Sequence, residues 1–261
     1  MVELTLPKGL TPDHKILEQN PTIRGDFREK VRTGLITIHR ALVDSFTETG
    51  IRLSNGESLD VDVVICCTGY EPFHLPYLPA DSIRSPDAPP NTADLYKFIM
   101  TPHYFNLFFL GFIELFGPLP PAVEAQARHI AAMLEGRIPR PSQETMVAHI
   151  KSFRAWQEKT FIHSERHILT SPQIEYIDSL LTPLGAVPSF PRLLGKVFTS
   201  SNPWKAMKIL NAVWFGIPSS AQWRLTGHGK KEQLARETVL RIADAKQELS
   251  RGETSYLTRA I

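Results

Sequence analysis

The sequence predicts an α/β fold in which short strands come first and helices dominate the remainder. Three observations support this prediction: a hairpin signal and a β-branched run before residue 70, a second apolar run near residue 110, and helical apolar periodicity after residue 121. Hydrophobic residues make up 42% and charged residues 21% of the 261 residues, which is typical of a globular chain with a sizeable core.

The strands are predicted from turn chemistry and from runs of β-branched residues. Asn55-Gly56 predicts a hairpin between 50–53 and a strand ending near Leu59, because both turn residues tolerate positive φ. The run VDVVICC at 61–67 predicts a strand buried on both faces, and NLFFLG at 106–111 predicts a second buried strand. Shorter strands are expected at 35–39 and 42–47.

The helices are predicted from periodicity and from capping residues. A helix is expected from about Ala122 to Glu135, with Pro121 near its first turn and Gly136 ending it. Ser142 is expected to cap a second helix that runs to about Thr160. Further helical pieces are expected at 24–32, 171–181, 203–215 and 231–250.

Composition excludes several classes of protein. The net charge is only +2 and the basic residues form no run, so nucleic-acid binding is not expected. The two cysteines, Cys66 and Cys67, are adjacent, so a disulfide between them would be strained and a reducing compartment is expected. No signal peptide and no apolar run of membrane-spanning length is visible, which favours a cytoplasmic location. No metal site is predicted, because the nine histidines form no HExxH motif.

The first segment that could carry chemistry is 51–70. A hydrophobic strand there ends at Thr68-Gly69-Tyr70, and open α/β sheets bind ligands just beyond the carboxyl ends of their strands. The glycine would let the backbone approach a ligand, and the two neighbours would supply hydroxyls. From the pattern alone, a core strand ending in a tight turn is the favoured alternative.

The second segment is 106–128, in which an apolar strand leads through a proline-rich loop into a helix. The helix end near Ala122 would offer free N–H groups and a partial positive charge, which stabilise an anion such as a reduced flavin. The alternative is a strand–loop–helix corner without a ligand. Glu124 and Arg128 are then an ordinary exposed pair one helical turn apart.

Two later segments are open to interpretation. Gly227-His228-Gly229 is not a phosphate-binding G-x-G-x-x-G motif, because Glu232 stands at the third glycine, so a loop packed against the sheet is expected. The segment Trp204–Phe215 carries apolar residues at 204, 207, 210 and 214 beside two lysines. It could lie on a membrane surface, although docking on its own domain is the more common use of such a stripe.

The order of these segments resembles the flavin-containing monooxygenases. The strand, hairpin and strand of 51–70 are similar to those that lead to the family's A-T-G-Y signature, and 106–128 resembles its P-x-x-E-x-Q-A-R helix. Residues 222–229 resemble a late R-L-T-G-P-G segment, with His228 in place of the proline. Cys67 stands at the alanine position of that signature, and the matching residues are Thr68, Gly69, Tyr70, Pro121, Glu124, Gln126, Ala127 and Arg128.

The resemblance implies part of a flavoprotein fold with two dinucleotide-binding domains and a helical C-terminal region. Residues 1–70 would be the end of the NADP-binding domain, and 71–261 would belong to the FAD-binding domain and its helical extension. NADPH would reduce FAD, and the reduced flavin would use O2 to oxygenate a small nucleophile such as an amine or sulfide. No catalytic side chain is implied. Cofactor contacts are implied for Cys67, Thr68, Gly69, Tyr70, Pro121, Ala122 and Gln126.

The glycine-rich cofactor motifs of the family do not occur in these 261 residues. Because pyrophosphate binding depends on such glycines and the helix ends they precede, we expect weak cofactor binding and little activity from this chain alone. Its partner would be an N-terminal half that carries them. Alternatives are a non-catalytic remnant that binds a partner or a membrane surface through Trp204–Phe215, and a Baeyer–Villiger or N-hydroxylating relative; the 222–229 match favours the first family over the latter.

Overall fold

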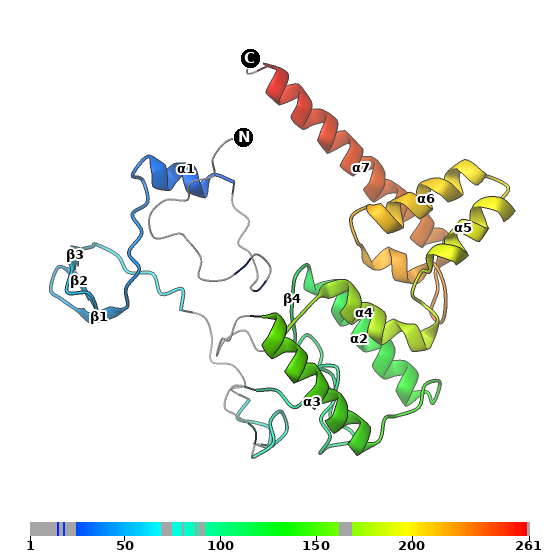
Figure 1. Ribbon diagram of the computed structural model, residues 1–261, viewed down its shortest axis with the longest axis horizontal. Helices are drawn as coiled ribbons and strands as arrows, with labels where there is room; N and C mark the ends of the chain where they lie inside the picture. Colours follow the sequence, from blue (N-terminus) through cyan, green and yellow to red (C-terminus); the bar gives the residue numbers. More distant parts are fainter. Residues whose placement is uncertain are drawn as a thin grey trace. The chain divides into compact units, whose positions relative to one another are not determined.

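The computed structural model describes residues 25–68, 75–79, 81–86, 92–161 and 169–259, together with Lys15, Glu18 and Ala88, and describes side chains of the last helix to residue 245. The described part contains both helices and strands, as predicted. The chain divides into two compact units, 1–74 with 160–162, and 75–159 with 163–261 (Figure 1).

The first unit contains the predicted hairpin. Helix α1 (Phe27–Arg32) precedes three antiparallel strands, β1 (Val43–Phe46), β2 (Gly50–Leu53) and β3 (Ser58–Asp60). Gly56 has φ +86° in the turn between β2 and β3, so the Asn-Gly prediction is confirmed. Leu53 is the one buried residue among those described in this unit, so this sheet has almost no core.

The prediction of a buried strand at 61–67 is wrong in this chain. The segment follows β3 but forms no strand, and residues 62–68 are all exposed. Val63 is 76% and Ile65 80% exposed. A β-branched run becomes a central strand only when neighbouring strands pair with it and other layers cover both faces. No described strand pairs with this segment, and 35–39 likewise forms no strand.

The second unit has its main core around α2 (Leu119–Leu134), α3 (Gln143–Thr160) and α4 (Gln173–Leu181). Figure 1 shows α2 and α4 side by side, and the two helices are in contact. Both helix-capping predictions are confirmed: Gly136 has φ +70° just after α2, and Ser142 Oγ accepts a hydrogen bond from the Thr145 N–H at 3.2 Å. The fully buried members of this core include Ile99, Met100, Ala122, Ile177, Leu180 and Ala186.

The prediction of a buried strand at 106–111 is also wrong. Only one bridge forms there, between Met100 and Phe108, and Leu110 is exposed. The nearby sheet consists of two parallel strands of two residues each, β4 (Glu114–Leu115) and β5 (Thr170–Ser171). Such a short ladder gives the apolar run no pairing partner along most of its length.

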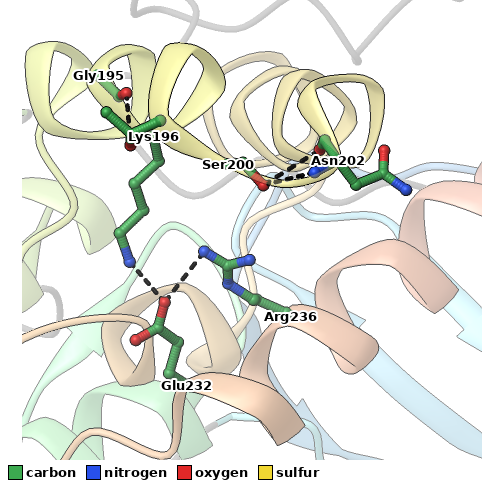
Figure 2. A network of polar contacts seen from close by, with 7 residues as sticks. Gly195, Lys196, Ser200, Asn202, Glu232 and Arg236 are labelled. Carbon is green, nitrogen blue, oxygen red and sulfur yellow. Dashed lines mark hydrogen bonds and ion pairs between the residues drawn. The ribbon is translucent and has the colours of Figure 1, made fainter.

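The C-terminal helices form two smaller clusters of buried residues. Helices α5 (Phe190–Thr199) and α6 (Pro203–Phe215) lie side by side and pack with α7 (Glu232–Arg259), and short 3₁₀ turns occupy Thr182–Leu184 and Ser220–Arg224. The sequence patterns predicted α6 and α7 but not α5. Lys196 of α5 and Arg236 of α7 both bind the Glu232 carboxylate, at 2.5 Å and 3.0 Å (Figure 2).

The apolar stripe predicted on α6 is not its docking face. Trp204 is 86% exposed, and Met207 and Trp214 are exposed as well, whereas Ala206, Ile209 and Leu210 are buried. Of the 204, 207, 210 and 214 positions, therefore, only Leu210 enters the core. Across the described residues, none of the helices is both long and apolar enough to span a bilayer.

Candidate functional site

The N-terminus of α2 is the centre of the candidate site. The helix begins at Leu119, three residues earlier than expected, and Pro118 caps it without a side-chain hydrogen bond. Pro120 and Pro121 are its second and third residues and have no N–H, so this end offers the free N–H of Leu119 alone rather than the several that were predicted. The helix dipole remains, and 117–120 is exposed.

The loop before α2 is held against the start of α4. Gly117 has φ +145°, and a Cβ atom at this position would lie 2.2 Å from Oε1 of Gln173. The same Gln173 side chain donates from Nε2 to the Pro118 carbonyl oxygen at 2.6 Å. Glycine is favoured here by its positive φ, which other residues rarely adopt, whereas the end of the Gln173 side chain could move away from an added Cβ.

Gln126 lies one turn beyond Ala122 and is fully buried, as Ala122 is. Its Oε1 accepts the Gly111 N–H at 2.8 Å, and its Nε2 donates to the Tyr176 hydroxyl at 2.7 Å. That hydroxyl donates in turn to the Lys97 carbonyl oxygen at 2.8 Å, and burial raises the pKa of Tyr176. Gln126 thus connects three segments beneath the start of α2.

Glu124 and Arg128 are not the exposed intrahelical pair that the spacing suggested. Glu124 instead accepts from Nε of Arg224 at 2.6 Å. Arg128 donates to the carbonyl oxygens of Trp223 and His228, at 3.0 Å and 2.9 Å. Both residues of the helix motif therefore bind the 222–229 segment, which the sequence pattern presents as a separate motif.

The Gly227-His228-Gly229 loop packs against the 3₁₀ turn that follows α4 rather than against a sheet. A Cβ atom on Gly227 would lie 2.4 Å from the Gly185 carbonyl carbon, and the His228 N–H donates to the Leu184 carbonyl oxygen at 2.9 Å. Arg224 donates from Nη1 to the Gly229 carbonyl oxygen at 2.8 Å. Gly227 is therefore needed for the close backbone packing of this loop.

The other predicted wall belongs to the first unit. Cys67 and Thr68 are exposed in the extended segment after β3, and Gly69 and Tyr70 lie outside the described residues. Pro121, Ala122 and Gln126 belong to the second unit, so a cleft shared by the two groups stays a prediction. Cys66 and Cys67 are free thiols, and the described part of the chain holds no cluster of histidine, cysteine and carboxylate residues suited to a metal.

The matched segments thus form a connected support for one exposed helix end. Pro121 is half-buried at this end, and Ala122 and Gln126 lie in the core behind it. Sequence reasoning missed that Arg128 and Arg224 are the connecting residues, although Arg128 belongs to the quoted motif. A helix end with a partial positive charge can stabilise an anionic group.

Comparison with known proteins shows the family to which this chain belongs. The Flavin-binding monooxygenase-like family model matches residues 7–252. Flavin-containing monooxygenase 5 of Mus musculus is 34% identical over 239 residues, which cover 90% of this chain and 42% of that protein. Dimethylaniline monooxygenase (N-oxide-forming) 2 of Rattus norvegicus is 33% identical over 235 residues, which cover 89% of this chain and 41% of that protein.

Among solved structures, S-allyl-L-cysteine S-oxygenase from Allium sativum is similar over 76% of this chain and 43% of its own, with 25% sequence identity and a TM-score of 0.47. The chain spans about two fifths of the length of the curated relatives. The chain belongs to the flavin-binding monooxygenase-like family.

Proposed function

We propose that this chain supplies the C-terminal part of the cofactor pocket of an NADPH- and FAD-dependent monooxygenase, which uses O2 to oxygenate nitrogen or sulfur in small nucleophiles. The family match over residues 7–252 carries the proposal. It is supported by the N-oxide formation named for one relative. The domain roles proposed are NADP binding for 1–70 and FAD binding for 71–261.

The start of α2 is the part of the chain that fits a flavin. When bound, the flavin supplies the oxygen chemistry, and the protein orients it and excludes water. The loop 117–120 is exposed, and the positive end of α2 has no side-chain cap, so a partly anionic ring edge would find unopposed positive potential there. We assign Pro121 to the surface of this wall, and Ala122 and Gln126 to the buried layer that holds it.

The second wall is proposed to be Cys67, Thr68, Gly69 and Tyr70, carried by the segment after β3. Two described members, Cys67 and Thr68, are exposed, and so are the apolar side chains of Val63 and Ile65 before them. An exposed β-branched run of this kind is expected to bury its side chains when further strands pair with it. We propose that an N-terminal half with the glycine-rich cofactor motifs supplies those strands.

This proposal predicts little cofactor binding by the chain alone. No G-x-G-x-x-G motif occurs in the 261 residues, and such motifs provide most of the backbone contacts to a dinucleotide pyrophosphate. The test is whether purified chain retains FAD by itself, and whether it does so with a polypeptide that carries the glycine motifs. NADPH oxidation by the pair, in the presence of a tertiary amine, tests the reaction class; ketone oxygenation would favour the Baeyer–Villiger alternative.

A second candidate function is attachment to a membrane surface through α6, and one observation favours it. Trp204, Phe215 and Phe198 are all exposed on the α5–α6 pair, and Lys205 and Lys208 are exposed on α6. Aromatic side chains beside lysines are typical of protein surfaces that lie on anionic bilayers. This surface would act together with the oxygenase role or in its place.

A further inference from the structure

A pocket of about 280 Å³ lies in the second unit among α3, α4 and the turn at 95–98. None of the residues assigned to the cofactor lines it. Its principal lining residues are Lys97, Phe98, His149, Phe153, Trp156 and Tyr176. An engineered apolar cavity of roughly 150 Å³ holds one benzene molecule, so this pocket suits a somewhat larger planar ring system.

The turn that carries Lys97 and Phe98 is strained. Both residues have positive φ, 49° and 55°, although neither is glycine, asparagine or aspartate. The Ile99 N–H donates to the Tyr96 carbonyl oxygen at 3.0 Å and closes the turn. The Tyr176 hydroxyl holds the Lys97 carbonyl oxygen at 2.8 Å. Strained backbone of this kind collects at binding sites, where the surroundings fix a side chain in one position.

The Lys97 ammonium gives one end of the pocket a positive charge. It donates to the Ser179 carbonyl oxygen at 2.6 Å, which leaves two of its three hydrogens for other acceptors. Within the described residues no carboxylate forms an ion pair with it, and burial lowers its pKa. Burial lowers the pKa of His149, and the nearby Lys97 charge lowers it further. The imidazole therefore adds no positive charge to the pocket at neutral pH.

His149 contributes an aromatic ring to the lining of the pocket. The ring stacks on Phe153 at 6.1 Å between centroids with an angle of 4° between planes. Its Nδ1 atom is enclosed by protein atoms and has no hydrogen bond, so a ligand in the pocket does not reach it.

The remaining walls are aromatic. Phe153 lies edge-on to Phe98 at 5.4 Å, and Phe153 and Trp156 have centroids 5.2 Å apart. Aromatic side chains around a single cation favour a flat ligand with one negative charge. Glu175 also lines the pocket and is exposed, so a ligand with a second negative charge is disfavoured.

We propose that this pocket binds a planar aromatic monocarboxylate, with the carboxylate on the Lys97 ammonium and the ring against Phe98, Phe153 and Trp156. The ligand is separate from the flavin, and its binding does not require the cofactor. The Lys97 ammonium selects for a negative charge at one end of the pocket. The aromatic side chains at the other end bury most of the ligand's surface.

The proposal is tested by calorimetric titration of the whole chain with 2-naphthoate and with its neutral analogue 2-naphthamide. We expect naphthoate to bind about tenfold more tightly than the amide, because an ammonium–carboxylate hydrogen bond is stronger than a neutral one. In Lys97→Met the preference disappears, in Lys97→Arg most of it remains, and in Phe153→Ala both ligands weaken together. Circular dichroism and the thermal midpoint establish that each variant is folded.

Three results would overturn the proposal. The first is that the unmodified chain does not bind naphthoate. The second is that folded Lys97→Met binds naphthoate as tightly as the unmodified chain does. The third is that FAD displaces naphthoate, since the pocket would then belong to the cofactor site. Failure of the chain by itself to bind FAD is expected and leaves this proposal unchanged. Failure of the chain to retain FAD together with a polypeptide that carries the glycine-rich motifs would count only against the proposed oxygenase function.

Discussion

Gln126 shows how one side chain can hold a site without facing it. Its amide joins the Gly111 N–H and the Tyr176 hydroxyl inside the core. The sequence motif alone could not distinguish a glutamine that contacts a cofactor from one that positions the backbone near it. The structure favours a positioning role for this residue, because both ends of its amide are hydrogen-bonded within the protein.

Replacing Gln126 by leucine is therefore expected to destabilise the fold. Leucine keeps a similar volume but leaves the Gly111 N–H and the Tyr176 hydroxyl without their partner, so the free energy of unfolding should fall by about 2–4 kcal/mol. Urea denaturation measures the change. The matched control is Gln143→Leu at the exposed start of α3, which should change stability by less than about 0.5 kcal/mol. Equal effects in the two variants would refute the assigned role.

The partners of Glu124 and Arg128 could not be predicted from the sequence around them. Their spacing fits an intrahelical pair, and nothing in the neighbouring sequence points to residues about a hundred positions away. Their actual partners, Arg224 and the backbone of 223–228, are set by how α2 and the 222–229 segment pack together. Long-range contacts of this kind follow from tertiary packing rather than from periodicity.

At the scale of elements, helices were predicted better than strands. α2, α3, α4 and α6 each carry their own capping or breaking residues, such as Gly136 and Ser142, and so were predicted close to their observed bounds. The run at 61–67 has the composition of a central strand, but a strand needs partners that this chain does not provide among its described residues. Sequence composition therefore did not predict the exposed, unpaired conformation of this run.

Replacing Gly227 or Gly195 by alanine is expected to change the free energy of unfolding in opposite directions. Gly227 has φ +74° and no room for a Cβ, so Gly227→Ala should lower the free energy of unfolding by more than about 2 kcal/mol. Gly195 lies within α5, and no atom lies within 4 Å of the position that an added Cβ would take, so Gly195→Ala should raise it by about 0.5–1 kcal/mol. Chemical denaturation compares both with the unmodified chain. A neutral Gly227→Ala would show that the loop does not need its close contact with Gly185.

The exposed aromatic side chains of α6 allow a test of membrane binding. If it lies on anionic bilayers, the chain should sediment with phosphatidylserine vesicles, and a Trp204→Ser, Phe215→Ser double variant should do so several-fold less. Tyr77→Ser removes an equally exposed aromatic side chain elsewhere and should leave sedimentation unchanged. Equal sedimentation of all three proteins, or none by the unmodified chain, would exclude this role.

At the scale of the whole molecule, the chain is a family member that covers about two fifths of its relatives' length. Its described sheets have two and three short strands, and its β-branched run is exposed. The helical part has its own cores and can hold the start of α2 in place without those sheets. We therefore expect the α2 wall to be preformed and the wall at 67–70 to depend on added strands.

Retention of FAD after gel filtration tests this account most directly. The chain alone is predicted to elute without flavin absorbance, whereas the chain together with a polypeptide carrying the two glycine-rich motifs is predicted to retain FAD, and to lose it when Leu119, at the exposed start of α2, is replaced by glutamate. One equivalent of FAD bound by the chain alone would contradict the account, and so would full retention by the Leu119→Glu pair.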